Sequence, residues 1–240
     1  MAEIVLVHGA WHGGWCWDQV AEALRERGHR VDAVTLPGHD RPGSPKRIWH
    51  RISQYVAAVD RAVAACSEPP VLVGHSMGGY TVQRYLERGS ARTGVLVASV
   101  PRRGAFPANL RLMREEPRAV LAATTLLDYH RLVDTPQKVR DLFLSDDAPP
   151  TVVDALAGRL QSESALAILT MVVRPPRPAR VTTPVRVIAA EDDTIFTLEE
   201  QHALAAAYGT EAVVLPGAHD LMVDAAWPQL ADAIDTIAAG

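Results

Sequence analysis

The sequence predicts an α/β fold, in which a mostly parallel sheet carries helices on both faces and a helical cap is inserted. Short aliphatic runs recur along the chain and stop at Gly, Pro or Asp, as strands buried on both faces do. Amphipathic helical segments separate these runs, which is typical of right-handed βαβ units. The 240 residues, 48% of them hydrophobic, suffice for one large domain of this kind.

The first hundred residues alternate strands and helices. Apolar residues between Ile52 and Val63 recur at three- and four-residue steps, which indicates an amphipathic helix. A glycine at position 28 favours the end of another helix. We expect strands at 4–7, 30–34, 71–73 and 94–98, and helices at 18–27, at 52–63 and from Ser76 to about Gly89.

The segment from about residue 101 to residue 178 interrupts the alternation. It is rich in Leu, Ala, Arg and Glu, and prolines divide it into short pieces. Thr135-Pro136 and Pro150-Thr151 have the pattern of helix starts, and no part is typical of a strand. We therefore expect a core domain of residues 1–100 and 179–240 with a cap at 101–178. Because sites in parallel sheets lie at the carboxyl ends of the strands, the cap is expected to cover that edge.

The alternation resumes near Pro184. We expect strands at 185–189 and 212–215. Between them, Thr197 and Glu200 have the spacing of a capping box, which predicts the start of a helix that ends near Gly209. Leu230, Ile234 and Ile237 give a closing helix its apolar stripe.

A serine with the surroundings of a nucleophile lies in the run Gly74-His75-Ser76-Met77-Gly78. An apolar strand precedes it and a helix follows, which is the context that the G-x-S-x-G motif requires. A serine hydroxyl needs a base, and the oxyanion formed by its attack needs N–H donors. We expect one donor at the Met77 amide, at a helix N-terminus, and a second at Ala10 in the turn after the first strand.

The catalytic base and its acid are expected in loops at the same edge of the sheet. His219 follows the last strand and a Pro-Gly turn, whereas the other eight histidines lie elsewhere. The acid must orient the imidazole, and both Asp192 and Asp193 follow the penultimate strand, so the residues alone leave the choice open. The stretch after the strand at 94–98 contains no acid. The predicted chain order is therefore Ser, Asp, His.

Charge, cysteine content and hydropathy indicate which partners and which location to expect. The formal net charge is −4 with both signs scattered, so no basic stripe favours nucleic acid. Neither of the two cysteines, Cys16 and Cys66, has the close companion of a metal or redox site, and we expect free thiols. No signal peptide or membrane span is apparent, which predicts a cytoplasmic protein with no membrane contact. No cofactor or metal ion is expected, and a homodimer is left open.

The opening stretch Leu6-Val7-His8-Gly9-Ala10-Trp11-His12-Gly13-Gly14-Trp15-Cys16-Trp17 resembles the α/β-hydrolase superfamily, and within it the branch with plant methyl-ester esterases and hydroxynitrile lyases. In that branch the last aspartate of the acidic loop is used, so the resemblance favours Asp193 over Asp192. It also implies that the oxyanion donors are Ala10 and Met77. The lyases carry lysine directly after the catalytic histidine, where this chain has Asp220. Cyanide release is therefore not expected.

The expected activity is hydrolysis of a small-molecule carboxylic ester through an acyl-enzyme on Ser76, with thioesters and lactones as related substrates. Trp11, next to the oxyanion loop, is expected to line the substrate pocket, and Trp15 and Trp17 to pack in the core. Two alternatives remain. One is a C–C lyase or another cofactor-free enzyme that uses His219 as base, and the other is a small-molecule receptor on the same scaffold.

Overall fold

The computed structural model describes residues 1–44, 46 and 49–240. Its sheet has six strands in the order β2-β1-β3-β4-β5-β6, and every pairing is parallel. The α/β class with a parallel sheet is confirmed. The strands are β1 (Glu3–Val7), β2 (Arg30–Val34), β3 (Val71–His75), β4 (Thr93–Val97), β5 (Val185–Ala190) and β6 (Ala212–Leu215).

The strands end together at one edge of the sheet. Val7 pairs with Gly74 between β1 and β3, and His75 pairs with Val97 between β3 and β4. The central strands are buried on both faces because helices cover the sheet on each side. The loops that carry the predicted site residues therefore emerge side by side.

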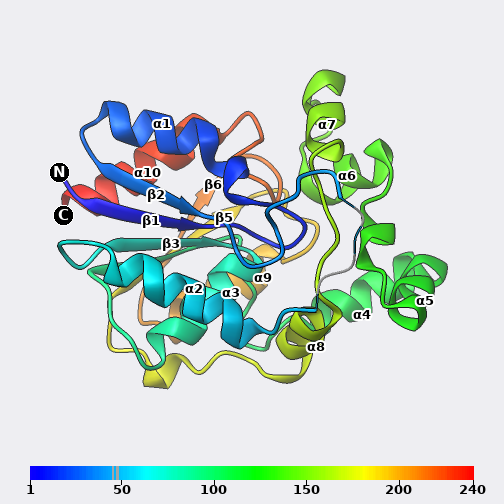
Figure 1. Cartoon of the computed structure of the whole chain (residues 1–240), viewed down its shortest axis with the longest axis horizontal. Helices are drawn as coiled ribbons and strands as arrows, with labels where there is room; N and C mark the ends of the chain where they lie inside the picture. The colour runs from blue at the N-terminus through cyan, green and yellow to red at the C-terminus, as the bar shows by residue number, and fades with distance from the viewer. Residues whose placement is uncertain (45, 47–48) are drawn as a thin grey trace.

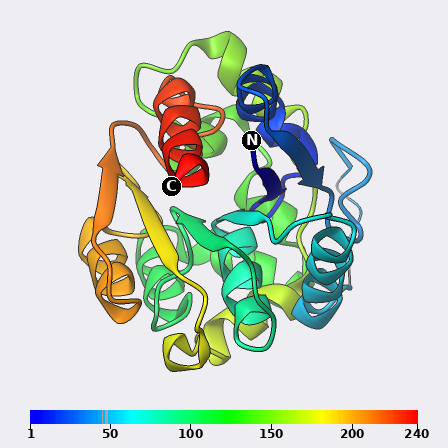
Figure 2. The same ribbon diagram turned by 90° about the vertical axis from the view of Figure 1, so that its left-hand side faces the viewer.

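Helices cover both faces of the sheet, as predicted. On one face lie α1 (Asp18–Glu26) and α10 (Trp227–Ala239), and on the other α2 (Ile52–Ala64), α3 (Met77–Leu86) and α9 (Leu198–Ala207) (Figure 1). Figure 2 looks from the end of the molecule at which both termini lie, with the red α10 and dark blue α1 on one side of the sheet. Each layer has its own apolar core against the sheet, one around Trp17 and the other around Tyr55.

The segment between β4 and β5 is helical and lies beyond the carboxyl ends of the strands (Figure 1). The helix starts predicted at Pro136 and Pro150 are confirmed. The division into a core of residues 1–100 and 179–240 and a cap of residues 101–178 stays a proposal. The helices of the segment are α4 (Phe106–Glu115), α5 (Pro117–Leu126), α6 (Pro136–Phe143), α7 (Pro150–Ala157) and α8 (Ala165–Val173).

Two parts of this segment pack differently. Side chains of α5, α6 and α7 form a cluster of their own, which Trp11 and Ile195 join from loops of the sheet. In contrast, Ala167, Ile168 and Met171 of α8 belong to the core that α2 and α3 form on the sheet. Helix α8 therefore fastens the end of the segment to the main core. Over the described residues, no helix has the length and apolar character needed to span a membrane.

Candidate active site

Ser76 occupies the sharp turn between β3 and α3. Its backbone has φ 52° and ψ −117°, in a region that residues other than glycine rarely adopt. The Ser76 amide donates to the carbonyl of Val97 at 3.0 Å. Ser76 is half-buried, whereas the residues on either side of it are buried. The turn therefore presents the side chain of Ser76 at the surface of the sheet edge, as a nucleophile requires.

The loop after β1 lies against this turn. A Cβ atom at Gly9 would lie 3.1 Å from the Cβ of Ser76 and 2.8 Å from Nδ1 of His75, so only glycine fits there. The next residue is Ala10, which is buried. Met77 is the first residue of α3, where backbone N–H groups have no partner within the helix. The residues predicted as oxyanion donors thus come from the loop after β1 and from the first residue of α3, directly after Ser76.

His219 and Asp193 are in direct contact. His219 Nδ1 donates to Oδ2 of Asp193 at 2.9 Å, and both side chains are buried. The other carboxylate oxygen, Oδ1, accepts from the amides of Ile195 at 2.8 Å and Phe196 at 3.0 Å, which fixes the carboxylate. Asp192, the alternative left open by the residues, is exposed.

The electrostatic surroundings favour the charged form of His219. Burial acts to lower the pKa of His219, but the charge and hydrogen bond of Asp193, together with the charge of Asp220, outweigh it and raise that pKa above its ordinary value. The imidazole also packs against the rings of His75, at 4.7 Å between centroids, and Phe196, at 5.6 Å. No hydrogen bond between Ser76 and His219 occurs within the part of the chain that is described.

Asp220 is completely buried behind the predicted base, a position that the sequence did not reveal. Its Oδ2 lies 2.8 Å from Nε2 of His12 and its Oδ1 lies 3.6 Å from Nε2 of His75. Burial acts to raise the pKa of the Asp220 carboxyl, but His12 in contact, with His75 and His219 nearby, outweighs burial and lowers that pKa. His12 in turn donates through Nδ1 to the carbonyl of Ala10 at 2.7 Å. Asp220 therefore links the loop of His219 to the loop after β1, which carries Ala10 and His12.

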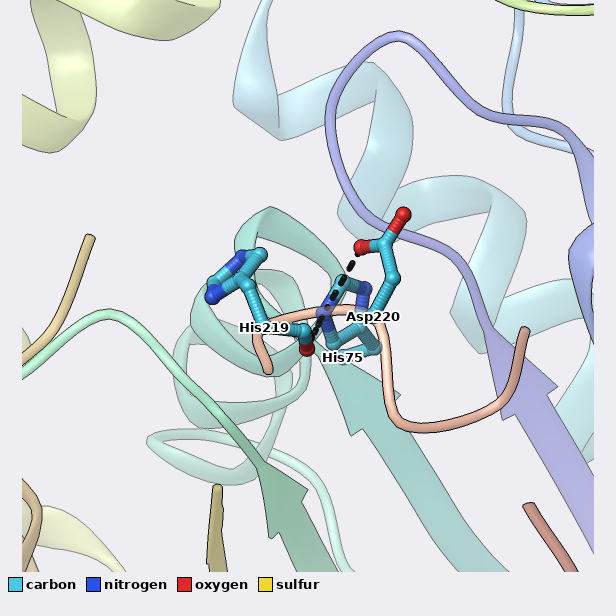
Figure 3. A group of neighbouring side chains, drawn as sticks. All are labelled: His75, His219 and Asp220. Carbon is cyan, nitrogen blue, oxygen red and sulfur yellow. Dashed lines mark hydrogen bonds and ion pairs between the residues drawn. The ribbon is translucent and has the colours of Figure 1, made fainter. Parts of the chain in front are cut away.

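His75, His219 and Asp220 also present donor atoms within 4.8 Å of one another, the spacing of a metal site. Figure 3 shows His75 between the backbone carbonyl of His219 and the carboxylate of Asp220. Its Nε2 donates a proton to that carbonyl at 3.0 Å, so this nitrogen has no lone pair for a metal ion. Burial, with His219 beside it, lowers the pKa of His75 to about 3. The hydrogen bond of His75 to the His219 carbonyl instead ties the turn at Ser76 to the loop of His219.

A cavity of about 380 Å³ opens at Ser76. Ser76, Ala10, Met77 and Trp11 line it, whereas the buried Asp193 and His219 are not among its lining residues. Most of its wall is apolar, and α4, α5, α6 and α8 contribute to it. Charged side chains also line it, namely Arg111, Glu115, Glu116, Lys138 and Asp141.

The other tryptophans differ in burial. Trp17 is fully buried, as expected. Trp15 is only partly buried, and the guanidinium of Arg159 covers its ring at 4.2 Å from the centroid. The expectation that Trp15 packs in the core is thus met only in part, because its loop lies at the boundary between the sheet and the helical segment.

The fold and this arrangement define an α/β enzyme scaffold with a serine at the strand-to-helix turn. The model of the alpha/beta hydrolase family matches residues 4–233, and the chain belongs to this family. A carbendazim-hydrolyzing esterase of Nocardioides sp. is 38% identical over 112 residues, 43% of this chain and 45% of that one. Methyl jasmonate esterase 1 of Vitis vinifera is 37% identical over 95 residues, 39% of this chain and 36% of that one.

These alignments span less than half the length of either relative. The similarity to the plant methyl jasmonate esterase nevertheless confirms the resemblance to the branch with plant methyl-ester esterases. Among solved structures, a pyrethroid hydrolase from Sphingobium faniae JZ-2 superposes with a TM-score of 0.69 at 23% identity. That likeness covers 100% of this chain and 98% of the other, and it concerns the fold.

Proposed function

We propose that this protein hydrolyses carboxylic esters of small molecules through an acyl-enzyme on Ser76, with Asp193 and His219 completing a triad. The observation that carries the proposal is the strained Ser76, which lines a cavity at the sheet edge where a buried carboxylate holds His219. His219 takes the proton of the serine and returns it to the leaving group, and Asp193 stabilises the imidazolium. The amides of Ala10 and Met77 would hold the oxyanion.

The surroundings of Asp220 favour hydrolysis over release of cyanide. A lyase of this branch needs a cation beside its base, and here the residue after His219 is a carboxylate. Asp220 is fully buried, is paired with His12 and does not line the cavity. A pure receptor would need neither the buried Asp193–His219 pair nor a serine in a strained turn, so the receptor alternative is also less favoured.

The size and lining of the cavity favour small, largely apolar esters as substrates. Its volume of about 380 Å³ lies in the range of small-molecule sites, and Met77, Ile168 and Phe196 belong to its apolar wall. Relatives named for carbendazim and methyl jasmonate esters agree with a substrate of this size. We also propose a cytoplasmic location, supported by free thiols at Cys16 and Cys66.

A fluorophosphonate probe tests the proposal, together with hydrolysis of a panel of short p-nitrophenyl esters. We expect the protein to be labelled and to turn over at least one ester, and Ser76→Ala to lose both. Ser67→Ala, at an exposed serine whose hydroxyl donates to Glu3, is the matched control and should keep both. If the folded protein neither reacts with the probe nor cleaves any ester of the panel, the proposal is wrong.

A further inference from the structure

Trp11 has a strained backbone beside the proposed oxyanion donor Ala10. Its φ is 64°, in the left-handed region that a bulky side chain disfavours. Such a conformation persists only where the surrounding structure enforces it. Because Trp11 directly follows Ala10, a change in this φ would reorient the peptide between them and displace Ala10.

Residues just before α8 bind both backbone polar groups of Trp11, and Tyr129, which lies between α5 and α6, binds its indole N–H. The Trp11 amide donates to Oε2 of Glu163 at 3.4 Å, and its carbonyl accepts from the amide of Gln161 at 2.9 Å. The indole Nε1 donates to the carbonyl of Tyr129 at 3.0 Å. The side chain of Gln161 adds donations to the carbonyls of His12 and His39, at 3.0 Å each. The segment before α8 therefore clamps the oxyanion loop.

Glu163 is the centre of this clamp. It is buried, and a buried carboxylate is costly unless donors surround it. Oε1 accepts from the hydroxyl of Tyr55 at 3.0 Å and the amide of Ser164 at 2.6 Å. Oε2 accepts from Nε2 of His39 at 2.9 Å as well as from Trp11. Among the residues that the structure describes, four donors from four parts of the chain thus fix one carboxylate that the proposed triad does not use.

We propose that Glu163 is a positioning residue for the oxyanion hole: it holds Trp11 in its left-handed conformation and thereby fixes the amide of Ala10. This inference rests on the proposed function. Oxyanion donors act because they are already in place when negative charge develops. Loosening Ala10 therefore weakens stabilisation of the transition state more than it weakens binding of the substrate. Glu163 therefore affects kcat more than KM.

The first test is Glu163→Gln, which keeps the shape but converts one acceptor oxygen into an NH₂ group that cannot accept. With a p-nitrophenyl ester, we expect kcat to fall about 10- to 100-fold, and KM to change much less. Binding of a trifluoromethyl ketone, which forms an oxyanion on the enzyme, should weaken in proportion to kcat/KM. Tyr55→Phe removes one donor to Oε1 without touching Trp11, and it should affect kcat far less.

A double-mutant cycle separates positioning from a general structural role. Glycine adopts a left-handed φ without strain, so in Trp11→Gly the loop no longer needs Glu163 for that conformation. The loss of kcat caused by Glu163→Gln should shrink in this background. An equal loss in both backgrounds, or a fall in kcat that only tracks the folded fraction, would overturn the inference.

A second variant, Glu163→Asp, tests the inference if Glu163→Gln folds poorly. Glu163→Asp keeps the charge but withdraws the carboxylate by one methylene, so the 3.4 Å contact with Trp11 is lost first. A lower kcat with an unchanged acid limb of the pH profile supports the inference, because His219 is unaffected. An unchanged kcat for an Asp variant with a wild-type fold overturns it. If wild-type protein neither reacts with fluorophosphonate nor hydrolyses esters, the proposed function fails instead.

Discussion

At the scale of single residues, two residues of the proposed site have strained backbone conformations. Among the described residues, those other than glycine with positive φ are Trp11, Ser76, Ala98 and Leu127. Each such residue costs about 1–3 kcal/mol, and the first two flank the proposed oxyanion hole. Ala98 follows β4, the strand that pairs with the one leading to Ser76. The stability of the rest of the fold offsets this cost, and in the proposed mechanism the strained conformations hold Ser76 and Ala10 in place before substrate binds.

Asp193→Asn tests the electrostatic role of the acid. In the proposed mechanism His219 must be neutral to accept the serine proton, so activity is lost as the pH falls through its pKa, which lies above the ordinary value. The substitution removes the charge of Asp193, the main cause that raises this pKa, and leaves burial, which lowers it, opposed only by the charge of Asp220. We therefore expect kcat to fall by about 10⁴-fold and the acid limb of kcat/KM to move to lower pH, measured with a p-nitrophenyl ester.

Asp192→Asn is the matched control, because Asp192 is the exposed neighbour on the same loop. It should keep the wild-type rate and the wild-type acid limb. An equal effect of the two substitutions would show that the loop, rather than the contact between Asp193 and His219, sets the basicity of the imidazole.

The sequence predicted the proposed site unevenly. Ser76 and His219 stand out because each follows a strand and a sharp turn in the expected order. Asp193 is buried and bonded to His219 whereas Asp192 is exposed, a difference that adjacent positions in a loop do not reveal. Asp220 and Glu163 were missed as supporting residues because their partners, among them His12 and Tyr55, lie more than a hundred residues away along the chain. The local sequence shows only that each of these acids stands next to a largely apolar stretch.

At the scale of elements, the turn at Ser76 depends on close approach of α3 to the end of β1. A Cβ at Gly78 would lie 2.3 Å from the carbonyl oxygen of Val7 and 2.5 Å from that of His8. Because backbone atoms cannot yield as side chains do, Gly78→Ala should push α3 away from the oxyanion loop. We expect a loss of about 1–3 kcal/mol in unfolding free energy and of about 10- to 100-fold in kcat/KM.

Urea unfolding and ester hydrolysis measure these two effects. Gly158→Ala serves as the comparison, since Gly158 follows α7 with a φ of −68°. A Cβ added there would have the carbonyl oxygen of Asp154 as its nearest atom, at 3.3 Å. It should change both quantities little. A Gly78→Ala protein with wild-type stability and rate would refute the tight packing described for this turn.

Helix α9 is joined to the cavity wall through its capping box. Thr197 accepts from the Glu200 amide, and Glu200 accepts from the Thr197 amide and forms an ion pair with Arg111 of α4 at 2.7 Å. Thr197→Ala should lower the unfolding free energy by about 1 kcal/mol in urea titration. Ester turnover should stay near wild type because Glu200 still holds Arg111. A loss of turnover without a loss of stability would contradict this interpretation.

Most elements could be predicted because local patterns determine them. The strand at Ala212–Leu215 and the helix starts at Pro136 and Pro150 agree with the structure, since turn residues bound them. Strand β3 continues to His75, two residues past the predicted end, because Gly74 and His75 still pair with β4. The attachment of α8 to the main core was not predictable, since it depends on side chains from α2 and α3.

At the scale of the whole molecule, buried histidines should make the fold sensitive to acid. Six of the nine histidines are buried, and burial lowers the pKa of His8 well below its ordinary value and that of His75 to about 3. In the unfolded chain, His8 and His75 each take up a proton near pH 6.5. Between pH 6.5 and the lowered values the unfolded state binds more protons, so the unfolding free energy falls as the pH falls.

His75→Gln tests this prediction at one site. The amide nitrogen of Gln is placed to replace Nε2 of His75 as the donor to the His219 carbonyl, but it does not titrate. One titrating group contributes a slope of about 1.4 kcal/mol per pH unit, so the variant should lose that much of the pH dependence between pH 6 and pH 4.5. Urea unfolding at a series of pH values measures the slope.

His202→Gln removes an exposed histidine from α9 and should leave the slope of the wild type. If His75→Gln retains the full slope, protonation of His75 does not drive acid unfolding. If both variants lose it equally, the effect reflects overall charge rather than burial. A selective loss in His75→Gln would mean that the support of the nucleophile turn also sets the lower pH limit of the fold, since the same buried ring serves both.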